Sequence, residues 1–127
     1  MRYGVIVGRV LLSVVFILSG VGKIMSWQGT AGFMASHGLP AVGVLLPLTV
    51  LCEIGGGLLL LTGLAPQLGA IVLFLFLIPT TVTFHNFWAY TGQDRQMQQV
   101  NFLKNVAIMG GLLVAASGGG APVSSEF

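Results

Sequence analysis

Four long apolar stretches constrain this chain more than any other feature of its sequence. They cover residues 5–24, 43–62, 66–88 and 98–117, and few charged side chains interrupt them. A helix needs about 20 mostly apolar residues to cross roughly 30 Å of hydrocarbon. Within that hydrocarbon every backbone N–H and C=O must be satisfied inside the protein, which a helix achieves without a neighbour. The four stretches therefore predict four transmembrane helices.

The composition leads to the same conclusion and excludes several other classes. Of the 127 residues, 55% are hydrophobic and 6% are charged, and the mean hydropathy is +0.97. A soluble domain carries about 25% charged residues, so this chain has too few to cover a water-facing surface. The net charge of +2 is scattered without a basic patch, and we expect no nucleic-acid partner. The lone cysteine, Cys52, excludes an intramolecular disulfide and a thiolate metal cage, and we expect no metal.

The order of the segments predicts one all-α domain. Residues 1–118 are expected to form an integral membrane four-helix bundle, and residues 119–127 a flexible tail. With four spans, both ends of the chain lie on one side, here called side A. The loops at 25–42 and 89–97 then lie on the opposite side, side B. The segment SWQGTAGFMASHGLP is too short and too polar to cross, and it predicts a short interfacial helix between the first two spans.

Every predicted span also carries polar or ionisable side chains. They are Arg9 and Lys23 in the first span, Glu53 in the second, His85 in the third, and Asn101, Lys104 and Asn105 in the fourth. An unpaired charge near the bilayer centre costs at least about 2.5–3.5 kcal/mol, so these groups must face one another or water rather than lipid. They predict a polar pocket in the bundle interior that opens toward side B.

Two interpretations of this pocket stay open at this point. In the first, the four charged side chains form an ion-pair network that fixes the helix register, with Glu53 paired to Arg9 or to Lys104. In the second, the pocket binds a small polar or amphipathic molecule. His85 then exchanges a proton near neutral pH, Lys104 and the two amides of the fourth span hold oxygen atoms, and Glu53 takes up a proton. A proton or ion pathway is less favoured, because no chain of acidic residues continues toward side A.

Five short motifs follow Arg9 along the chain. They are FILSGVGKI, GFMASHGLP, CEIGGGLLLLTG, FHNFW and NFLKNVAIMGGLL. Their order and spacing resemble the DoxX family of small bacterial membrane proteins, from Arg9 to about Gly118. The resemblance implies a four-span bundle in the bacterial plasma membrane, with the seven polar residues forming a shared intramembrane site. It also implies a link to redox enzymes, because some members are similar to the DoxD subunit of a thiosulfate:quinone oxidoreductase and others associate with enzymes of thiol and oxidative-stress defence.

On this basis we expect a quinone-interacting membrane subunit of an oxidoreductase. The candidate catalytic residues are Glu53 and His85, and the quinone-binding set adds Asn101, Lys104 and Asn105. With one cysteine in the chain, the electrons must come from a partner protein, an external cofactor, or a soluble thiol or sulfur substrate. The alternative is a non-catalytic accessory or assembly subunit of a larger membrane complex. A permease ranks third, because the chain is short and without a repeat, and it would need a homo-oligomer.

Overall fold

The computed structural model describes residues 2–118, and every regular element in that range is a helix. The elements are α1 (Arg2–Met25), α2 (Trp27–Ser36), α3 (Val42–Thr62), α4 (Pro66–Phe84), the 3₁₀-helix η1 (Phe87–Ala89) and α5 (Gly92–Ala116). Four of them, α1, α3, α4 and α5, are long and apolar enough to cross a membrane. The predicted all-α bundle of four spans is therefore confirmed. The tail predicted at 119–127 lies outside the described residues.

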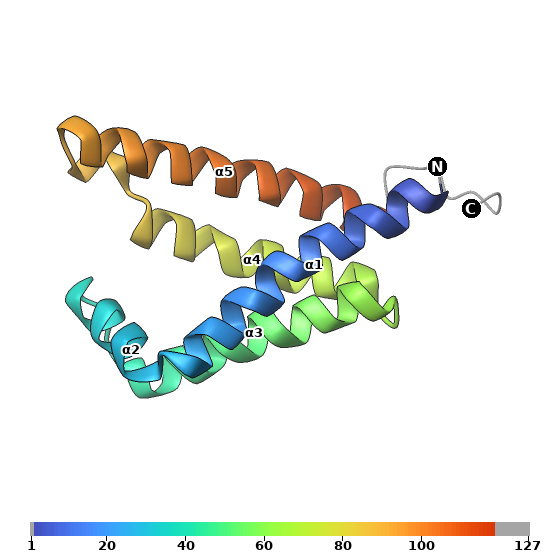
Figure 1. Ribbon diagram of the computed structural model, residues 1–127, viewed down its shortest axis with the longest axis horizontal. Helices are drawn as coiled ribbons and strands as arrows, with labels where there is room; N and C mark the ends of the chain where they lie inside the picture. The colour runs from blue at the N-terminus through green and yellow to red at the C-terminus, as the bar shows by residue number, and fades with distance from the viewer. Residues whose placement is uncertain (1, 119–127) are drawn as a thin grey trace.

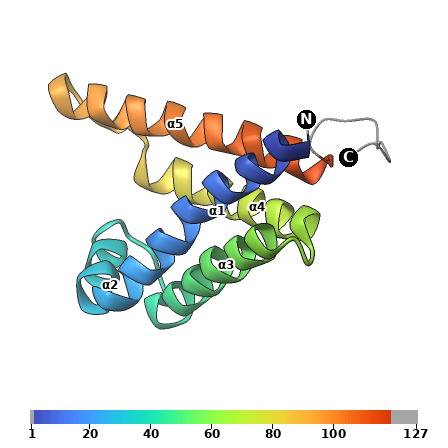
Figure 2. The ribbon, with the colours of Figure 1, turned by 45° about the vertical axis from the view of Figure 1, so that its right-hand side comes forward.

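The spans alternate in direction along the bundle. The start of α1 and the end of α5 lie together at the right-hand end of Figure 1, which is side A, while α2 and η1 lie at the opposite end. Neighbours in sequence are the main packing partners: α1 packs on α3, α3 on α4, and α4 on α5. By contrast α1 and α5 touch sparsely, and they diverge toward side B in both ribbon views (Figures 1 and 2). Among neighbouring spans of the bundle, α1 and α5 therefore make the weakest contact.

Two span boundaries differ from the expectation. The fourth span, α5, begins at Gly92 rather than at residue 98, so most of the expected loop at 89–97 is helical. Hydropathy detects only the part of a helix that is apolar, and the first turns of α5 are polar; Asp94 in the first turn also suits the positive end of the helix dipole. The third span, α4, ends as an α-helix at Phe84 rather than near 88, and the 3₁₀-helix η1 begins at Phe87.

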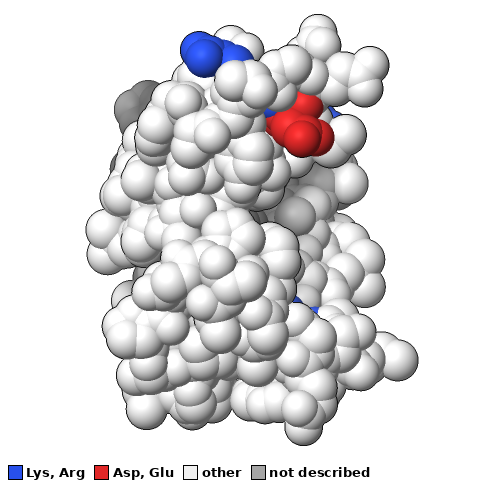
Figure 3. Space-filling model, turned by 90° about the vertical axis from the view of Figure 1, so that its left-hand side faces the viewer, with Lys and Arg blue, Asp and Glu red and all other residues white. Residues whose placement is uncertain are grey.

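The short helix expected between the first two spans is present as α2. Phe33 stacks on Phe84 at the end of α4, with ring centroids 5.4 Å apart, and Met34 is buried. His37 lies against the same two rings, at centroid distances of 4.4 and 5.0 Å. These contacts hold α2 across the side-B end of the bundle. That end face is largely free of charged side chains in Figure 3, where the largest coloured patches lie near the top, toward the start of α5.

The core depends on close approach of helix backbones. A Cβ atom placed on Gly69 would lie 2.6 Å from the carbonyl oxygen of Gly56, and one placed on Gly57 would lie 2.7 Å from Cγ1 of Ile17. Small residues at such crossings let membrane helices gain packing energy without a hydrophobic driving force. Around these crossings the side chains of Leu60 and Leu73 are fully buried. Glycine at 56, 57 and 69 therefore sets the spacing of α1, α3 and α4.

Replacement of Gly69 tests this role. Gly69→Ala should destabilise the protein by about 1–3 kcal/mol, because the added methyl group meets a backbone oxygen that has little room to move. Gly55→Ala is the matched control, since a Cβ there would have no neighbour within 4 Å. Thermal unfolding in detergent measures both variants. Equal melting temperatures would contradict the assigned packing.

Candidate functional site

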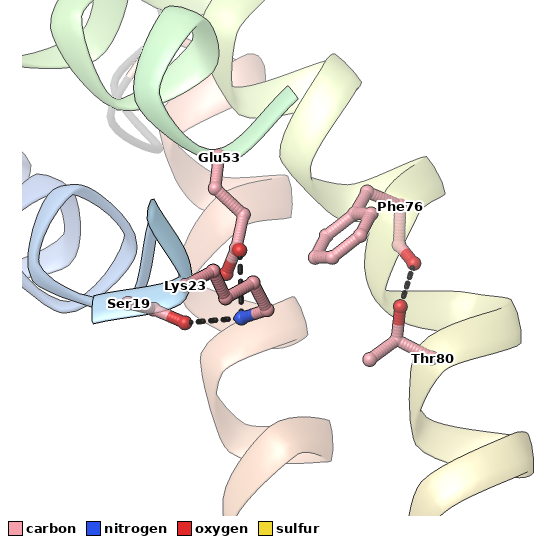
Figure 4. Close-up of polar contacts among 5 residues, drawn as sticks. All are labelled: Ser19, Lys23, Glu53, Phe76 and Thr80. Atoms are coloured by element: carbon pink, nitrogen blue, oxygen red, sulfur yellow. Dashed lines mark hydrogen bonds and ion pairs between the residues drawn. The ribbon is translucent and has the colours of Figure 1, made fainter. Parts of the chain in front are cut away.

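The centre of the candidate site is an ion pair between the first and second spans. Glu53 lies about halfway along α3 and is 3% exposed. Its Oε1 lies 2.8 Å from Nζ of Lys23 on α1, and the same ammonium donates a hydrogen bond of 2.8 Å to Oγ of Ser19. Figure 4 shows the ammonium held between these two oxygens. Within the described chain no other group bonds to the carboxylate, so Lys23 alone neutralises it.

The local sequence of α1 explains why Lys23 reaches Glu53. Ser19 and Lys23 are one helical turn apart, and Gly20 lies on the same side of α1. A Cβ atom on Gly20 would lie 3.4 Å from Cβ of Glu53, so the glycine brings α1 directly against the acidic residue. Helical side chains point back toward the N-terminus of their helix, which directs Lys23 from side B toward the centre of the bundle.

The predicted partners of Glu53 were therefore wrong. The sequence suggested Arg9 or Lys104, because both long side chains could reach its depth. In the structure Lys104 is exposed on the surface of α5. The guanidinium of Arg9 lies at side A, where Nη2 would be 3.3 Å from a Cβ placed on Gly63 in the turn between α3 and α4. The expected four-member ion network reduces to one pair, Lys23 and Glu53, in the described chain.

This pair borders a cavity of about 350 Å³ in the side-B half of the bundle. All four spans contribute to it, and α2 contributes Thr30, Phe33 and Met34. Outside α2, the polar side chains in its lining come from the four spans and from the residue that follows α4, and they are Ser19, Lys23, Thr49, Glu53, Thr80, His85, Gln98 and Asn105. The rest of the lining is aliphatic or aromatic. The ring of Phe76, for example, points toward the ion pair from α4 in Figure 4. The cavity is thus amphipathic, with one charged wall.

Two hydrogen bonds between α4 and α5 order the opposite wall. Nδ1 of His85 lies 2.9 Å from Oε1 of Gln98. With that amide oxygen as acceptor, Nδ1 carries the proton, and Nε2 of the neutral ring keeps its lone pair. Nδ2 of Asn105 donates to Oγ1 of Thr81 at 3.1 Å, and Thr81 is 3% exposed. These bonds fix the orientation of the imidazole and of the amide beside the cavity.

The structure brings together four of the seven predicted site residues. Lys23, Glu53, His85 and Asn105 line the cavity. The other three lie outside its lining, and they are Arg9 at side A, the half-buried Asn101 and the exposed Lys104. The prediction of a shared pocket for all seven was therefore too broad.

Helix rotation explains why Lys104 lies outside the cavity. Gln98 and Asn105 are seven residues apart, about two turns, and share one side of the helix. Lys104 precedes Asn105 by one residue and is rotated from it by about 100°. Gln98 was missed by sequence reasoning, although its two-turn spacing to Asn105 was a usable signal. Ser19 was missed as well, and its signal was the one-turn spacing to Lys23.

A double-mutant cycle tests the ion pair. Removal of one partner leaves a buried charge, so Lys23→Met or Glu53→Gln alone should destabilise the protein by about 3 kcal/mol, the lower end for breaking a buried pair. The double variant should be more stable than the sum of the two losses predicts. The same cycle between Lys104 and Glu53 should give a coupling near zero. Thermal unfolding of the purified variants supplies the values, and additive losses for Lys23 and Glu53 would refute the pair.

The chain is similar to known bacterial membrane proteins. The DoxX family model matches residues 4–86, a segment that contains Lys23, Glu53 and His85 and ends before Gln98 and Asn105. The inner membrane protein YqjF of Escherichia coli (strain K12) is 39% identical over 119 residues, which are 93% of this chain and 86% of that protein. The inner membrane protein YphA of the same organism is 32% identical over 117 residues, 91% of this chain and 84% of that protein. No solved structure matches the chain significantly.

Proposed function

The chain belongs to the DoxX family and is a multi-pass inner membrane protein, and from this premise we propose that its side-B cavity binds the head group of a quinone. In this proposal the protein is the quinone-interacting membrane subunit of an oxidoreductase for thiol, sulfur or oxidative-stress chemistry. The observation that carries the proposal is the Lys23–Glu53 pair, because it places hydrogen-bonding charge on the wall of a cavity inside the apolar bundle.

Lys23 has the hydrogen-bonding capacity that a carbonyl ligand needs. An ammonium has three donors. Two of them point to described partners, Glu53 and Ser19, and the third is available for a ligand oxygen. A hydrogen bond from a charged donor contributes about 1.5–3 kcal/mol, more than one from a neutral donor. Asn105 and His85 stand on the facing wall, so polar groups border the cavity on two sides.

The shape and access of the cavity also fit a ring with a long apolar tail. Small-molecule sites usually have volumes of about 300–1,000 Å³ and mostly apolar walls with a few polar groups. This cavity has about 350 Å³, and Phe16, Phe76 and Phe84 provide flat apolar surface. The lining draws on both α1 and α5, the two spans that touch sparsely, and the proposal places the entry of a hydrophobic ligand between them.

The residues present define what this chain contributes to the reaction. A bound quinone supplies a two-electron, two-proton acceptor. Glu53 and His85 are the groups that hold or move protons beside it, and Lys23 holds an oxygen atom in place. The chain has one cysteine, Cys52, and thus no dithiol of its own, so a partner subunit or a soluble thiol or sulfur compound delivers the electrons.

Quinone content tests the proposal. After gentle detergent purification, lipophilic quinones extracted from the wild type should approach one per chain. Lys23→Met and Glu53→Gln should lower this content at least about tenfold, the loss that corresponds to one charge-assisted hydrogen bond. Lys104→Gln is the matched control, because this lysine is also in a span but is exposed. It should retain the wild-type content.

Two outcomes would overturn the proposal. Equal quinone content in all four proteins would mean that the ion pair has no part in binding. A wild type without quinone that copurifies with another polypeptide in fixed ratio would favour the accessory or assembly subunit.

A further inference from the structure

A second cavity, of about 680 Å³, lies in the side-A half of the bundle. It is bordered by the start of α1, the end of α5 and the start of α4, where α1 and α5 lie side by side in both ribbon views (Figures 1 and 2). The glycine floor of this cavity is formed by Gly4, Gly8 and Gly111, which have no side chains to fill the space. Most of the other lining side chains are aliphatic. Leu11, Val15 and Val114 are 64%, 50% and 52% exposed, so the cavity opens sideways to the lipid.

The charged side chain in this lining is Arg9. Its Nε is buried and has no hydrogen-bond partner among the described residues. The acidic residues in that range are Glu53, which is paired with Lys23, and Asp94, which stands in the first turn of α5 at side B. An arginine stays charged at any physiological pH, and a charge within a span is costly unless an anion compensates it. The described residues do not supply this anion.

The position of the guanidinium indicates where the anion lies. Nη2 and Nη1 of Arg9 would be 3.3 and 3.5 Å from a Cβ atom on Gly63, in the turn that joins α3 to α4. The side chain therefore extends from its place in α1 toward the side-A end, as long basic side chains do near membrane interfaces. The amide of Gln67 lies at the same end, with Nε2 3.5 Å from a Cβ position on Gly118. Two sets of N–H donors thus stand at the side-A end of the cavity, whose other walls are largely apolar.

We propose that this groove binds an anionic phospholipid from the side-A leaflet. The guanidinium of Arg9 holds the phosphate oxygens through two parallel N–H bonds, the geometry that suits arginine. Gln67 donates a further bond, and one acyl chain lies along the glycine floor between α1 and α5. Basic pockets between membrane helices recognise lipid headgroups in this way. The bound lipid completes the contact that the sparse packing of α1 and α5 leaves open.

Native mass spectrometry of the full chain tests the proposal, with phosphatidylglycerol and phosphatidylcholine of identical acyl chains offered in equal amounts. The wild type should retain the anionic lipid at least about tenfold over the zwitterionic one. Arg9→Gln should remove this preference. Arg95→Gln, which changes an exposed arginine at side B, should keep it. Because Arg9→Gln can fail to fold, Arg9→Lys is the second variant, and it should reduce the preference without abolishing it.

Several results would overturn the proposal. One is equal retention of the two lipids by the wild type. Another is an unchanged preference for the anionic lipid in both Arg9 variants. A preference that appears only after deletion of residues 119–127 would mean that carboxylates of that segment, rather than a lipid, neutralise Arg9. A lipid-free dimer that dissociates in Arg9→Gln would assign the groove to a second copy of the chain. Quinone content should be unchanged in Arg9→Gln, so this test and that of the side-B cavity are separate.

Discussion

The pairing of Lys23 with Glu53 is the constraint on which the rest of the site depends. A carboxylate that is 3% exposed near the middle of a span requires a cation within contact distance. To provide it, α1 must approach α3 closely, and Gly20 makes that approach possible. The pair also keeps polar groups on one wall of the side-B cavity, where complete burial by apolar side chains would raise the cost of both charges. Packing, charge and cavity are therefore consequences of one contact.

The order of helix contacts explains where the cavities lie. Each span packs strongly on its neighbour in sequence, while α1 and α5 touch sparsely. Both cavities are bordered by α1 and α5, and Val15 belongs to both linings. At side B α2 adds Thr30, Phe33 and Met34 to the lining, and its Phe33 rests on Phe84 at the end of α4. At side A the glycines Gly4, Gly8 and Gly111 leave space between α1 and α5.

The sequence predicted the number of spans, and with it that both ends of the bundle's chain lie on one side, because bilayer thickness fixes how many apolar residues a span needs. It also placed Glu53 near the middle of its helix, as in the structure, since position along a helix follows from a constant rise per residue. Depth alone cannot identify a partner. The rotation of each helix about its axis and the crossing of α1 on α3 decided that Lys23, not Lys104, meets Glu53. The polar first turns of α5 were missed for a related reason, because hydropathy reports contact with lipid and not helical structure.

The two cavities divide their chemistry between segments of the chain. Their charged side chains, Arg9, Lys23 and Glu53, all come from α1 and α3, within residues 4–86 that the family model matches. Helix α5 adds neutral groups to both linings, including Gln98 in one and Gly111 in the other. Charge determines whether a polar ligand is held in a bilayer at all, while neutral walls determine which shapes fit. Changes on α5 should therefore alter which ligand is held, and changes in the charged residues of α1 and α3 should weaken binding.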